Sequence, residues 1–321
     1  MDKTHNLPKL SEHRNPVLSL IAILLLSIGF FQIIGPILGI VVTLPFFDFN
    51  FNRVLSVLSN PTAYPDAKVP IYLIQGISHL VSFVIVPWLY LRYVERKRIG
   101  VFFKEHALET IPVALVFFMV IVFMGINSVI IEWNMSWQLP EFMSGFESVV
   151  KKFEEAAKIQ TEFLTTFDAN GQFLLALLVI AVIPGISEEL LFRGFIQNLL
   201  NRITGNAHIA IWIGGFVFSL FHMQFYGLVP RMLLGVLFGY LYYWSGSLSL
   251  AMLAHFVNNA FTVIMMYLYQ KGMISMDIQT EESASSLYAL VSLVIFAVLV
   301  YGFKQYFTKK SGKNEGLGES I

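Results

Sequence analysis

The sequence predicts an all-α polytopic membrane protein with about eight transmembrane helices. Of its 321 residues, 56% are hydrophobic and only 13% are charged, and the mean hydropathy is +0.68. A soluble domain carries about 25% charged residues, so the deficit of charge is the first sign of a membrane protein. The second is the recurrence of apolar runs long enough to cross a hydrocarbon core about 30 Å thick. The third is that basic residues gather beside these runs.

Composition also excludes several kinds of site and partner. The chain has no cysteine, so it can form no disulfide framework, thiolate nucleophile or cysteine-based metal site. Its formal net charge is zero, which gives no reason to expect a nucleic-acid partner. We expect the first apolar run to be a membrane span and not a cleavable signal peptide, because it is too long and no small-residue cleavage site follows it.

Three spans are expected in the first part of the chain, at residues 17–47, 71–93 and 111–131. The first contains Pro36, where we expect a kink. Residues 48–70, which include three prolines, are expected to form a polar loop between the first two spans.

The longest polar segment, residues 132–170, is expected to contain an amphipathic helix between the third and fourth spans. We expect this helix to rest on the membrane surface or cap the bundle, in preference to binding substrate. Its apolar residues recur at helical spacing and are Phe142, Phe146, Val149, Val150, Phe153 and Ala157.

Five further spans follow in the second part of the chain. Turns are predicted around Gly205 and Gly246, because glycine and small polar residues interrupt the apolar pattern there. The spans are expected at residues 171–204, 207–223, 228–244, 248–269 and 287–307.

One membrane domain is therefore predicted at residues 16–307, between an N-terminal segment, residues 1–15, and a tail, residues 308–321. Lysine and arginine mark the cytoplasmic side of membrane proteins, and the densest basic cluster surrounds Arg96. With eight spans, the two termini and the Arg96 loop fall on one side. We therefore expect a multi-pass protein of the cell (inner) membrane with both termini in the cytoplasm.

Charged residues interrupt the fourth span, where Glu188, Glu189 and Arg193 stand in an apolar context. A charged side chain at bilayer depth costs at least ~2.5–3.5 kcal/mol on insertion scales, so three together need partners and a role. Glu189 and Arg193 are four residues apart and can form an ion pair on one helix face. Glu188 lies about 100° from Glu189 around the helix and is then free to act on another group.

Two later spans carry polar pairs at the same spacing. Phe218 and His222 are four residues apart, as are His255 and Asn259, so each pair lies on one face of its helix. We expect these pairs and Glu188 to form one site.

The expected depths of these residues agree. Glu188 lies 17 residues before Gly205 and His222 lies 17 after it, so both are level in a helical hairpin. At ~1.5 Å per residue they lie about 25 Å from the turn. His255, nine residues past Gly246, reaches the same level if the first hairpin protrudes by about 12 Å, two helical turns. We expect the site in the cytoplasmic half of the bilayer.

These residue types can hydrolyse an amide bond in two ways. Glu188 beside His222 can take a proton from water, while His255 and Asn259 donate hydrogen bonds to the developing oxyanion. Alternatively, Glu188, His222 and His255 can hold a zinc ion with water in the fourth position. The sequence contains no His-Glu-x-x-His motif and no Gly-x-Ser-x-Gly motif, so the usual helical zinc site and a serine mechanism lack support.

Other polar or small residues in the spans receive no chemical role. Arg231 follows Pro230 at a helix start and is expected to anchor that helix at the interface, and Gly235 with Gly239 is expected to allow close helix packing. The remaining histidines are expected to have no part in the site: His5, His13, His79, His106 and His208.

The order Glu-Glu-x-x-x-Arg, Phe-x-x-x-His and His-x-x-x-Asn on successive membrane helices resembles the signature of the CAAX-protease and bacteriocin-processing (CPBP, or Abi) family. The resemblance covers about residues 184–260, within a core at about 171–271, and no position of the three motifs departs from the pattern. It implies an intramembrane endopeptidase with an eight-helix core.

The resemblance also implies roles for the individual residues. Glu188 would activate water with His222 as its partner, His255 and Asn259 would stabilise the oxyanion, and Glu189 with Arg193 would support the site. Members are commonly labelled metalloproteases, whereas a glutamate-activated water without metal is implied by relatives. The cofactor therefore stays open between zinc and none. Membrane lipids and a membrane-associated or C-terminal peptide or protein substrate are the expected partners.

Two other classes of function compete with this prediction. A non-catalytic membrane scaffold or bacteriocin-immunity protein could keep the same fold. A proton-coupled transporter could use Glu188 as a carrier site, and broken helices or inverted repeats would favour it. We find neither in the sequence.

Overall fold

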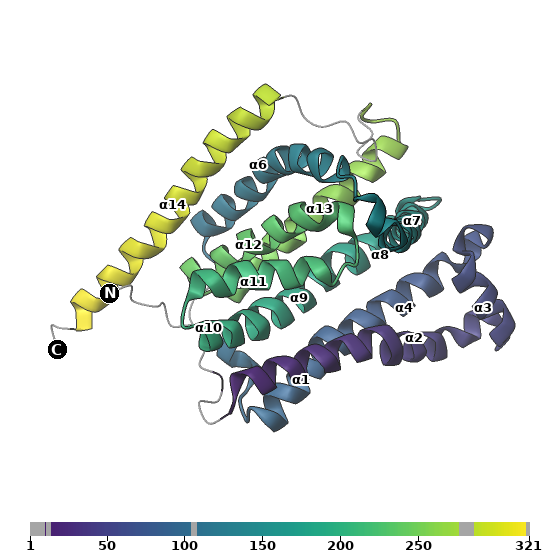
Figure 1. Cartoon of the computed structure of the whole chain (residues 1–321), viewed down its shortest axis with the longest axis horizontal. Helices are drawn as coiled ribbons and strands as arrows, with labels where there is room; N and C mark the ends of the chain where they lie inside the picture. Colours follow the sequence, from purple (N-terminus) through teal and green to yellow (C-terminus); the bar gives the residue numbers. More distant parts are fainter. Residues whose placement is uncertain (1–9, 11–13, 104–107, 276–285, 319–321) are drawn as a thin grey trace.

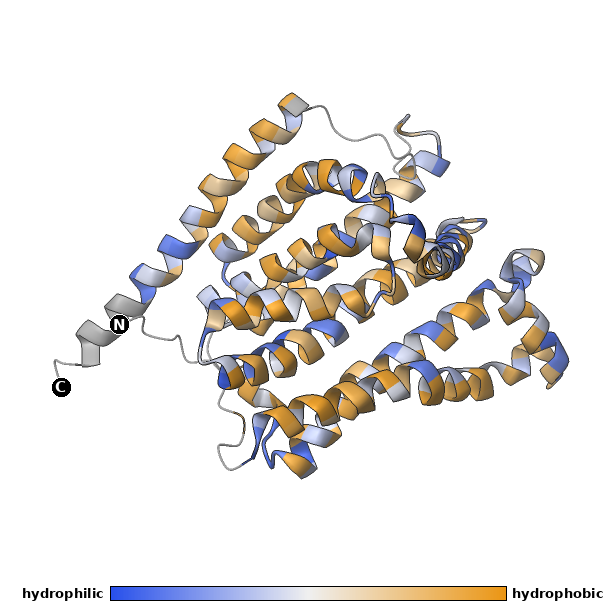
Figure 2. Ribbon diagram, viewed as in Figure 1, coloured by the Kyte–Doolittle hydropathy of each residue, from blue (hydrophilic) through white to orange (hydrophobic). Residues whose placement is uncertain are grey.

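The computed structural model describes residues 10, 14–103, 108–275 and 286–318, and these ranges contain only helices, turns and loops. Seven helices are long and apolar enough to cross a membrane, and α11 is a shorter apolar helix (Figures 1 and 2). The predicted all-α polytopic membrane fold is therefore confirmed. The predicted roles of His5, His13 and His106 concern positions outside the described residues.

The first span is one apolar rod made of α1 (Pro16–Gly29), the π-helical turn η1 (Phe30–Ile34) and α2 (Gly35–Thr43). The π-helical turn ends just before Pro36, the residue at which we expected a kink. The rod packs on α4 (Lys68–Leu80), beside it in Figure 1. At Gly39 a side chain would bring its Cβ to 2.7 Å from the Ile74 Cα, so glycine is needed for this backbone contact.

The segment expected as a polar loop, residues 48–70, contains a helix that the prediction missed. This helix, α3 (Phe51–Ser59), begins at Asn50, whose side-chain oxygen accepts a hydrogen bond from the Arg53 amide at 3.1 Å. α4 then continues through η5 (Val81–Ile85), α5 (Val86–Leu89) and η6 (Tyr90–Val94) to the basic cluster.

The third span, α6 (Thr110–Met135), packs along the last helix, α14 (Ser286–Gly318) (Figure 1). Between the third and fourth spans lies α7 (Ser144–Thr165), the expected amphipathic helix. Lys68 and Tyr72 of α4 donate hydrogen bonds to the Thr166 and Leu164 carbonyls, which ties the C-terminal end of α7 to the bundle.

The fourth span is continuous but changes its helical form four times. It consists of α8 (Asn170–Ala176), η9 (Leu177–Val182), α9 (Ile183–Glu189), η10 (Leu190–Gln197) and α10 (Asn198–Thr204). The segments η9 and η10 are π-helical, and they enclose the short α-helical stretch that carries Glu188 and Glu189. π-Helical turns leave backbone groups without their α-helical partners and occur frequently at functional sites.

Both predicted turns are present and hold glycine in the left-handed conformation, with φ +65° at Gly205 and +67° at Gly246. The fifth span is shorter than predicted, because α11 (Ala207–Leu220) ends before His222. Residues 221–227 therefore form a turn and a 3-10 segment at the level where a helix was expected. α12 (Leu228–Ser245) and α13 (Leu248–Gln270) complete the core.

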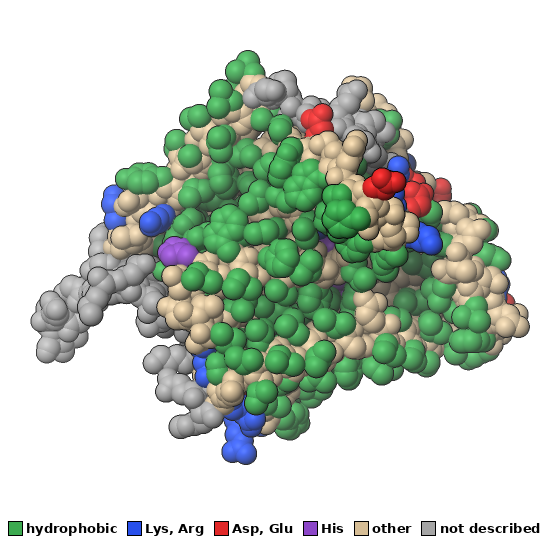
Figure 3. Space-filling model, viewed as in Figure 1, with side chains coloured by type: hydrophobic (Ala, Val, Ile, Leu, Met, Phe, Trp, Pro, Cys, Tyr) green, Lys and Arg blue, Asp and Glu red, His purple; other side chains and the backbone are tan. Residues whose placement is uncertain are grey.

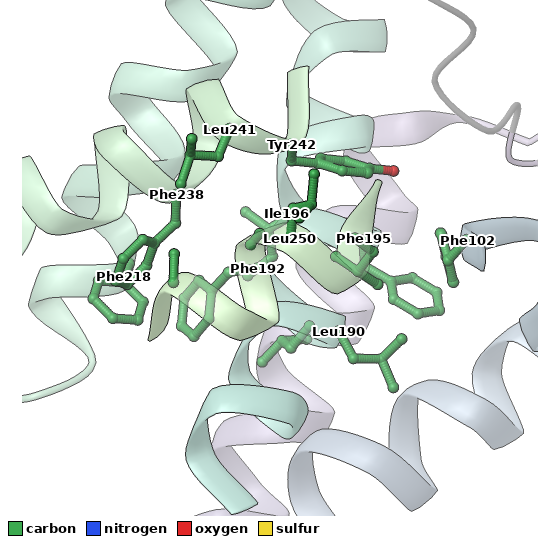
Figure 4. Close-up of a cluster of buried hydrophobic side chains, with 14 of the residues drawn as sticks. Phe102, Leu190, Phe192, Phe195, Ile196, Phe218, Phe238, Leu241, Tyr242 and Leu250 are labelled. Atoms are coloured by element: carbon green, nitrogen blue, oxygen red, sulfur yellow. The ribbon is translucent and has the colours of Figure 1, made fainter. Parts of the chain in front are cut away.

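The end of the bundle that holds η10 and α10 is tightly packed. From Leu190 to Leu199 each residue of the fourth span is buried, and aromatic rings from η10, α11 and α12 fill the space between the helices (Figure 4). The opposite end, under α7, is hollow.

Candidate active site

A cavity of about 460 Å³ lies between α7, α4, α9, α12 and α13. Glu188, His222, His255 and Asn259 all line it, so the structure brings the four predicted residues together. Glu189 and Arg193 lie behind its wall. The remaining polar lining residues are Gln75, His79, Gln160, Thr161, Gln224, Arg231 and Asn258.

Glu188 is 7% exposed, and its carboxylate has unused capacity to accept hydrogen bonds. Its Oε1 lies 3.7 Å from Nδ1 of His79. Its Oε2 is buried and has no hydrogen-bond partner among the described residues. Unpaired buried polar atoms are rare, and each calls for an explanation such as a bound water or a catalytic role.

Glu189 and Arg193 form the ion pair expected from their spacing, with 2.7 Å between Oε1 and Nη1. The second guanidinium nitrogen of Arg193 donates to the Gly235 carbonyl on α12 at 2.7 Å. The guanidinium also lies 4.9 Å from the centre of the Phe218 ring and 5.4 Å from that of Phe238. Arg193 thus links η10 to α11 and α12 and keeps a charge satisfied at a site only 2% exposed.

His255 joins this ion pair, since its Nδ1 lies 2.8 Å from the same Glu189 oxygen. A carboxylate held by an arginine can only accept, so Nδ1 of His255 carries the hydrogen. Neutral His255 then has a lone pair at Nε2, and only the protonated ring can donate from Nε2 to an oxyanion. The oxyanion role implied for His255 therefore requires an imidazolium, which Glu189 is placed to stabilise.

His222 lies just beyond the end of α11, with its ring folded back on the helix. Its Nδ1 lies 3.0 Å from the Phe218 carbonyl. A carbonyl accepts only, so Nδ1 donates and Nε2 keeps its lone pair for a group in the cavity. No hydrogen bond or ion pair joins His222 to Glu188 within the described part of the chain.

Asn259 uses part of its amide to hold the fourth span in place. Its Nδ2 donates to the Ile180 carbonyl in the π-helical segment η9 at 2.9 Å, and its Oδ1 accepts from Asn258 at 3.0 Å. The amide group carries two hydrogens, so one remains for a group in the cavity.

Two cavity residues were assigned wrongly from the sequence. His79, expected to be outside the site, lies 3.7 Å from the Glu188 carboxylate, and its Nδ1 has no hydrogen-bond partner in the described ranges. Arg231, expected as an interfacial anchor, lines the cavity. The one signal in the sequence was the presence of each residue inside or beside an apolar run, and no local motif marked either.

The zinc arrangement of Glu188, His222 and His255 does not fit this geometry. Across the described residues, no group of three or more His, Cys, Asp or Glu side chains is placed to hold a metal ion. The Nδ1 contacts of His222 and His255 are not the obstacle, because a histidine that binds zinc through Nε2 usually donates Nδ1–H to such an acceptor.

The cavity reaches the surface beside α7. Gln160 and Thr161, which line it, are exposed, whereas the lining residues from α9 and η10 are buried. In Figure 3 the molecule is hollowed below the charged side chains of α7, and histidine atoms are visible inside. The predicted topology puts α7 on the non-cytoplasmic side, which disagrees with the predicted position of the site in the cytoplasmic half of the bilayer. The two predictions diverge because α11 was extended to Met223 and α7 was omitted from the walls of the site.

Comparisons with known proteins identify the part of the chain that builds this cavity. Residues 170–261 match a protein family described as type II CAAX prenyl endopeptidase, Rce1-like. Searches of the curated proteins and of the solved structures gave no match. The matched segment begins at α8 and ends in α13, and it contains all three motifs of the predicted site. This segment is therefore similar to the type II CAAX prenyl endopeptidases, which supports the resemblance to the CPBP family found in the sequence.

Proposed function

We propose that this protein is an intramembrane endopeptidase in which Glu188 activates the water that attacks the scissile peptide bond. One observation carries the proposal. Glu188 presents a buried carboxylate with an unpaired oxygen to a cavity that also contains the free Nε2 of His222. A carboxylate and a lone-pair nitrogen can both accept from one water molecule, which orients it and makes it a better nucleophile.

The proposed reaction uses this chain's own side chains for each proton transfer. Glu188 takes a proton from water while the oxygen bonds to the carbonyl carbon. The resulting oxyanion accepts hydrogen bonds from the remaining N–H of Asn259 and, when His255 is protonated, from its Nε2. Glu188 then gives the proton to the amide nitrogen, the C–N bond breaks, and a carboxylic acid and an amine form. The acid passes its remaining proton to the amine, so a carboxylate and an ammonium group leave.

The environment of the site supports a protease better than the competing functions. The fourth span is continuous within the described residues, whereas transporters place their sites at broken helices. A scaffold would have no need for a buried carboxylate with an unpaired oxygen. We further propose the cell membrane as the location, with both termini cytoplasmic, because the basic clusters lie at the end of the bundle away from α7.

The decisive experiment is a cleavage assay with Glu188→Gln. Glutamine keeps the size of the side chain but cannot take the proton, so hydrolysis should fall by ~10²–10⁴-fold while the protein stays folded. His222→Ala should show a similar loss, and the double variant should be little worse than either, because residues that act together are not additive. Asn259→Ala should cost about 10²–10³-fold.

The assay compares equal amounts of folded protein in liposomes against a mixture of short apolar peptides. Glu155→Gln is the matched control, because Glu155 lies exposed on α7 and does not line the cavity. A chelator arm tests the metal mechanism independently, since activity that disappears with chelation and returns with zinc would replace the metal-free mechanism. Turnover that survives Glu188→Gln would remove the proposed base and favour a scaffold.

A further inference from the structure

His79 of α4 lies in the wall of the cavity and is held there by two aromatic rings. It is 7% exposed and lines the cavity. Its ring makes edge-to-face contacts with Phe31, at 5.0 Å between ring centres, and with Phe83, at 5.4 Å. These two phenylalanine rings stack on each other at 4.9 Å. Aromatic packing therefore fixes where the nitrogen atoms of the imidazole lie.

The helix that carries His79 packs directly on the span that carries Glu188. α4 contacts α9, and a Cβ atom at Gly76 would lie 3.4 Å from the Ile183 side chain. Gly76 lies three residues before His79, a spacing that places both on one helix face. His79 thus faces the fourth span because of the way the two helices pack, although α4 lies outside the matched residues 170–261.

His79 and Glu188 each have a buried polar atom without a partner. Nδ1 of His79 has none among the described residues, and neither does Oε2 of Glu188. The distance from Nδ1 to Oε1 of Glu188 is 3.7 Å, which exceeds the length of a hydrogen bond by about 0.5–1 Å. Catalytic hydrogen bonds are often long in the free enzyme and shorten in the complex with substrate. The two groups are therefore placed to form such a bond.

The other two cavity histidines have already used the atom that would make this contact. Nδ1 of His222 faces the Phe218 carbonyl, and Nδ1 of His255 faces Glu189. In the neutral rings Nε2 then only accepts, as an ionised carboxylate does. Of the histidines that line the cavity, only His79 has a buried Nδ1 without a partner in the described part of the chain.

We propose that Nδ1 of His79 donates a hydrogen bond to Oε1 of Glu188 when substrate is bound, and thereby positions the base. A carboxylate accepts at both oxygens, so Oε2 stays available to the attacking water. A base must come within about 2.6–3.2 Å of the group whose proton it takes, and a carboxylate that cannot turn keeps Oε2 within that reach. The inference rests on the proposed endopeptidase function and adds to it a positioning residue from outside the matched segment.

The first test is a cleavage assay with His79→Phe. Phenylalanine keeps an aromatic ring against Phe31 and Phe83 but has no N–H. The variant should lose about 10–150-fold in kcat, the range for a hydrogen bond to a charged group. KM should change little, because the lost bond acts on the base and not on the peptide. A folded His79→Phe protein with unchanged kcat would overturn the inference.

His208→Phe is the matched control for this substitution. His208 is exposed on α11, does not line the cavity, and has its Nδ1 3.0 Å from the Tyr240 hydroxyl. The control therefore also removes a histidine with a polar contact, but at a distance from Glu188. It should keep the kcat of the unaltered protein.

Two further variants test which ring nitrogen matters. The amide nitrogen of asparagine can occupy the place of Nδ1, whereas that of glutamine reaches the place of Nε2. His79→Asn should therefore recover kcat to within about 10-fold of the unaltered protein, and His79→Gln should resemble His79→Phe. A structural role would not follow the position of the donor. Equal losses in all three variants would overturn the inference.

A double variant tests whether His79 acts through Glu188. Residues that act as a unit are not additive, so His79→Phe should cause little further loss in the Glu188→Gln protein. A full additional loss would show that His79 acts on the reaction by a separate route, which contradicts the positioning role.

Infrared difference spectra separate this inference from the proposed function, because they require no turnover. The difference between unaltered and Glu188→Gln protein, each with a bound apolar peptide, identifies the carboxyl band of Glu188. A hydrogen bond from His79 predicts that His79→Phe shifts this band and that His79→Asn does not. If the band shifts but no cleavage is found, the contact stands without the protease. If cleavage depends on Glu188 but neither the band nor kcat responds to His79→Phe, the protease function stands and the role of His79 is wrong.

Discussion

Around Arg193 most polar side chains inside the bundle are hydrogen-bonded, although Oε2 of Glu189 is not, whereas around Glu188 several buried polar atoms of the described residues have no partner. At the packed end, Arg193 bonds Glu189 and the Gly235 carbonyl, and Gln197 donates to the Gly239 carbonyl at 3.2 Å. At the hollow end, unpaired atoms belong to Gln75, His79, Glu188 and Arg231. The hollow end has unused acceptors and donors, which the proposed function would use for water and substrate, and the packed end supplies the rigidity that holds them there.

The largest expected contrast between the two ends is their accessibility from opposite sides of the membrane. The chain has no cysteine, so a single introduced cysteine is the only thiol that a maleimide can label. Gln160→Cys beside the cavity should react with a membrane-impermeant maleimide on intact cells. Arg98→Cys, exposed beyond the packed end, should react only after the membrane is opened.

Each variant should be labelled either almost completely or hardly at all. The unaltered protein, which has no cysteine, measures the background labelling. The reverse pattern would place the cavity mouth in the cytoplasm and overturn the proposed orientation of both termini. Labelling of Gln160→Cys that is blocked by a bound peptide would show directly that the substrate enters beside α7.

The next largest effect concerns the buried charge at the packed end. Arg193→Ala leaves Glu189 buried with His255 as its one remaining partner among the described residues, and breaking such a pair costs about 3–5 kcal/mol. The variant should lose folded protein and thermal stability in detergent as well as activity. Arg92→Ala, an exposed arginine at the same end, should stay within about 0.5 kcal/mol of the unaltered protein. Equal stability of the two variants would show that the Arg193 pair is not essential to the packed end.

Many features of the two ends could be predicted from the sequence, because they depend on residues close together in the chain. Hydropathy located the membrane spans, and the four-residue spacing located the pair of Glu189 and Arg193. The three motifs also identified four residues that line one cavity.

The remainder depends on contacts between distant segments. His79 lies beside Glu188 although the two are 109 positions apart in sequence, and no sequence motif in α4 predicts this contact. Arg231 lines the cavity because α11 ends at Leu220 and the turn that follows, residues 221–227, packs against α7. Hydropathy cannot predict a helix end that tertiary packing determines. The apolar pattern of the sequence continues to Met223, three residues past the end of α11. The π-helical segments likewise have no distinct sequence pattern, although Asn259 binds a carbonyl in one of them.

The smallest expected effect tests the close contact of α11 and α12 at the packed end. A Cβ atom at Gly235 would lie 2.9 Å from the Gly215 Cα, so the two backbones must separate to admit even a methyl group. Overpacking of this kind costs about 1–3 kcal/mol. Gly235→Ala should also move the carbonyl that accepts from Arg193, and should therefore lower the thermal stability.

Gly302→Ala on α14 is the matched control, because a Cβ atom there has nothing within 4 Å. Alanine in place of glycine in an open helix position stabilises by roughly 0.5–1 kcal/mol, so this variant should unfold at the same temperature or slightly higher. If the same glycine-to-alanine change lowers the unfolding temperature at Gly235 and raises it at Gly302, the rigid part of the molecule lies at the α11–α12 contact. If Gly235→Ala were as stable as Gly302→Ala, the helices could separate without cost, and the packed end could not be what fixes Glu189 and His255 beside the cavity.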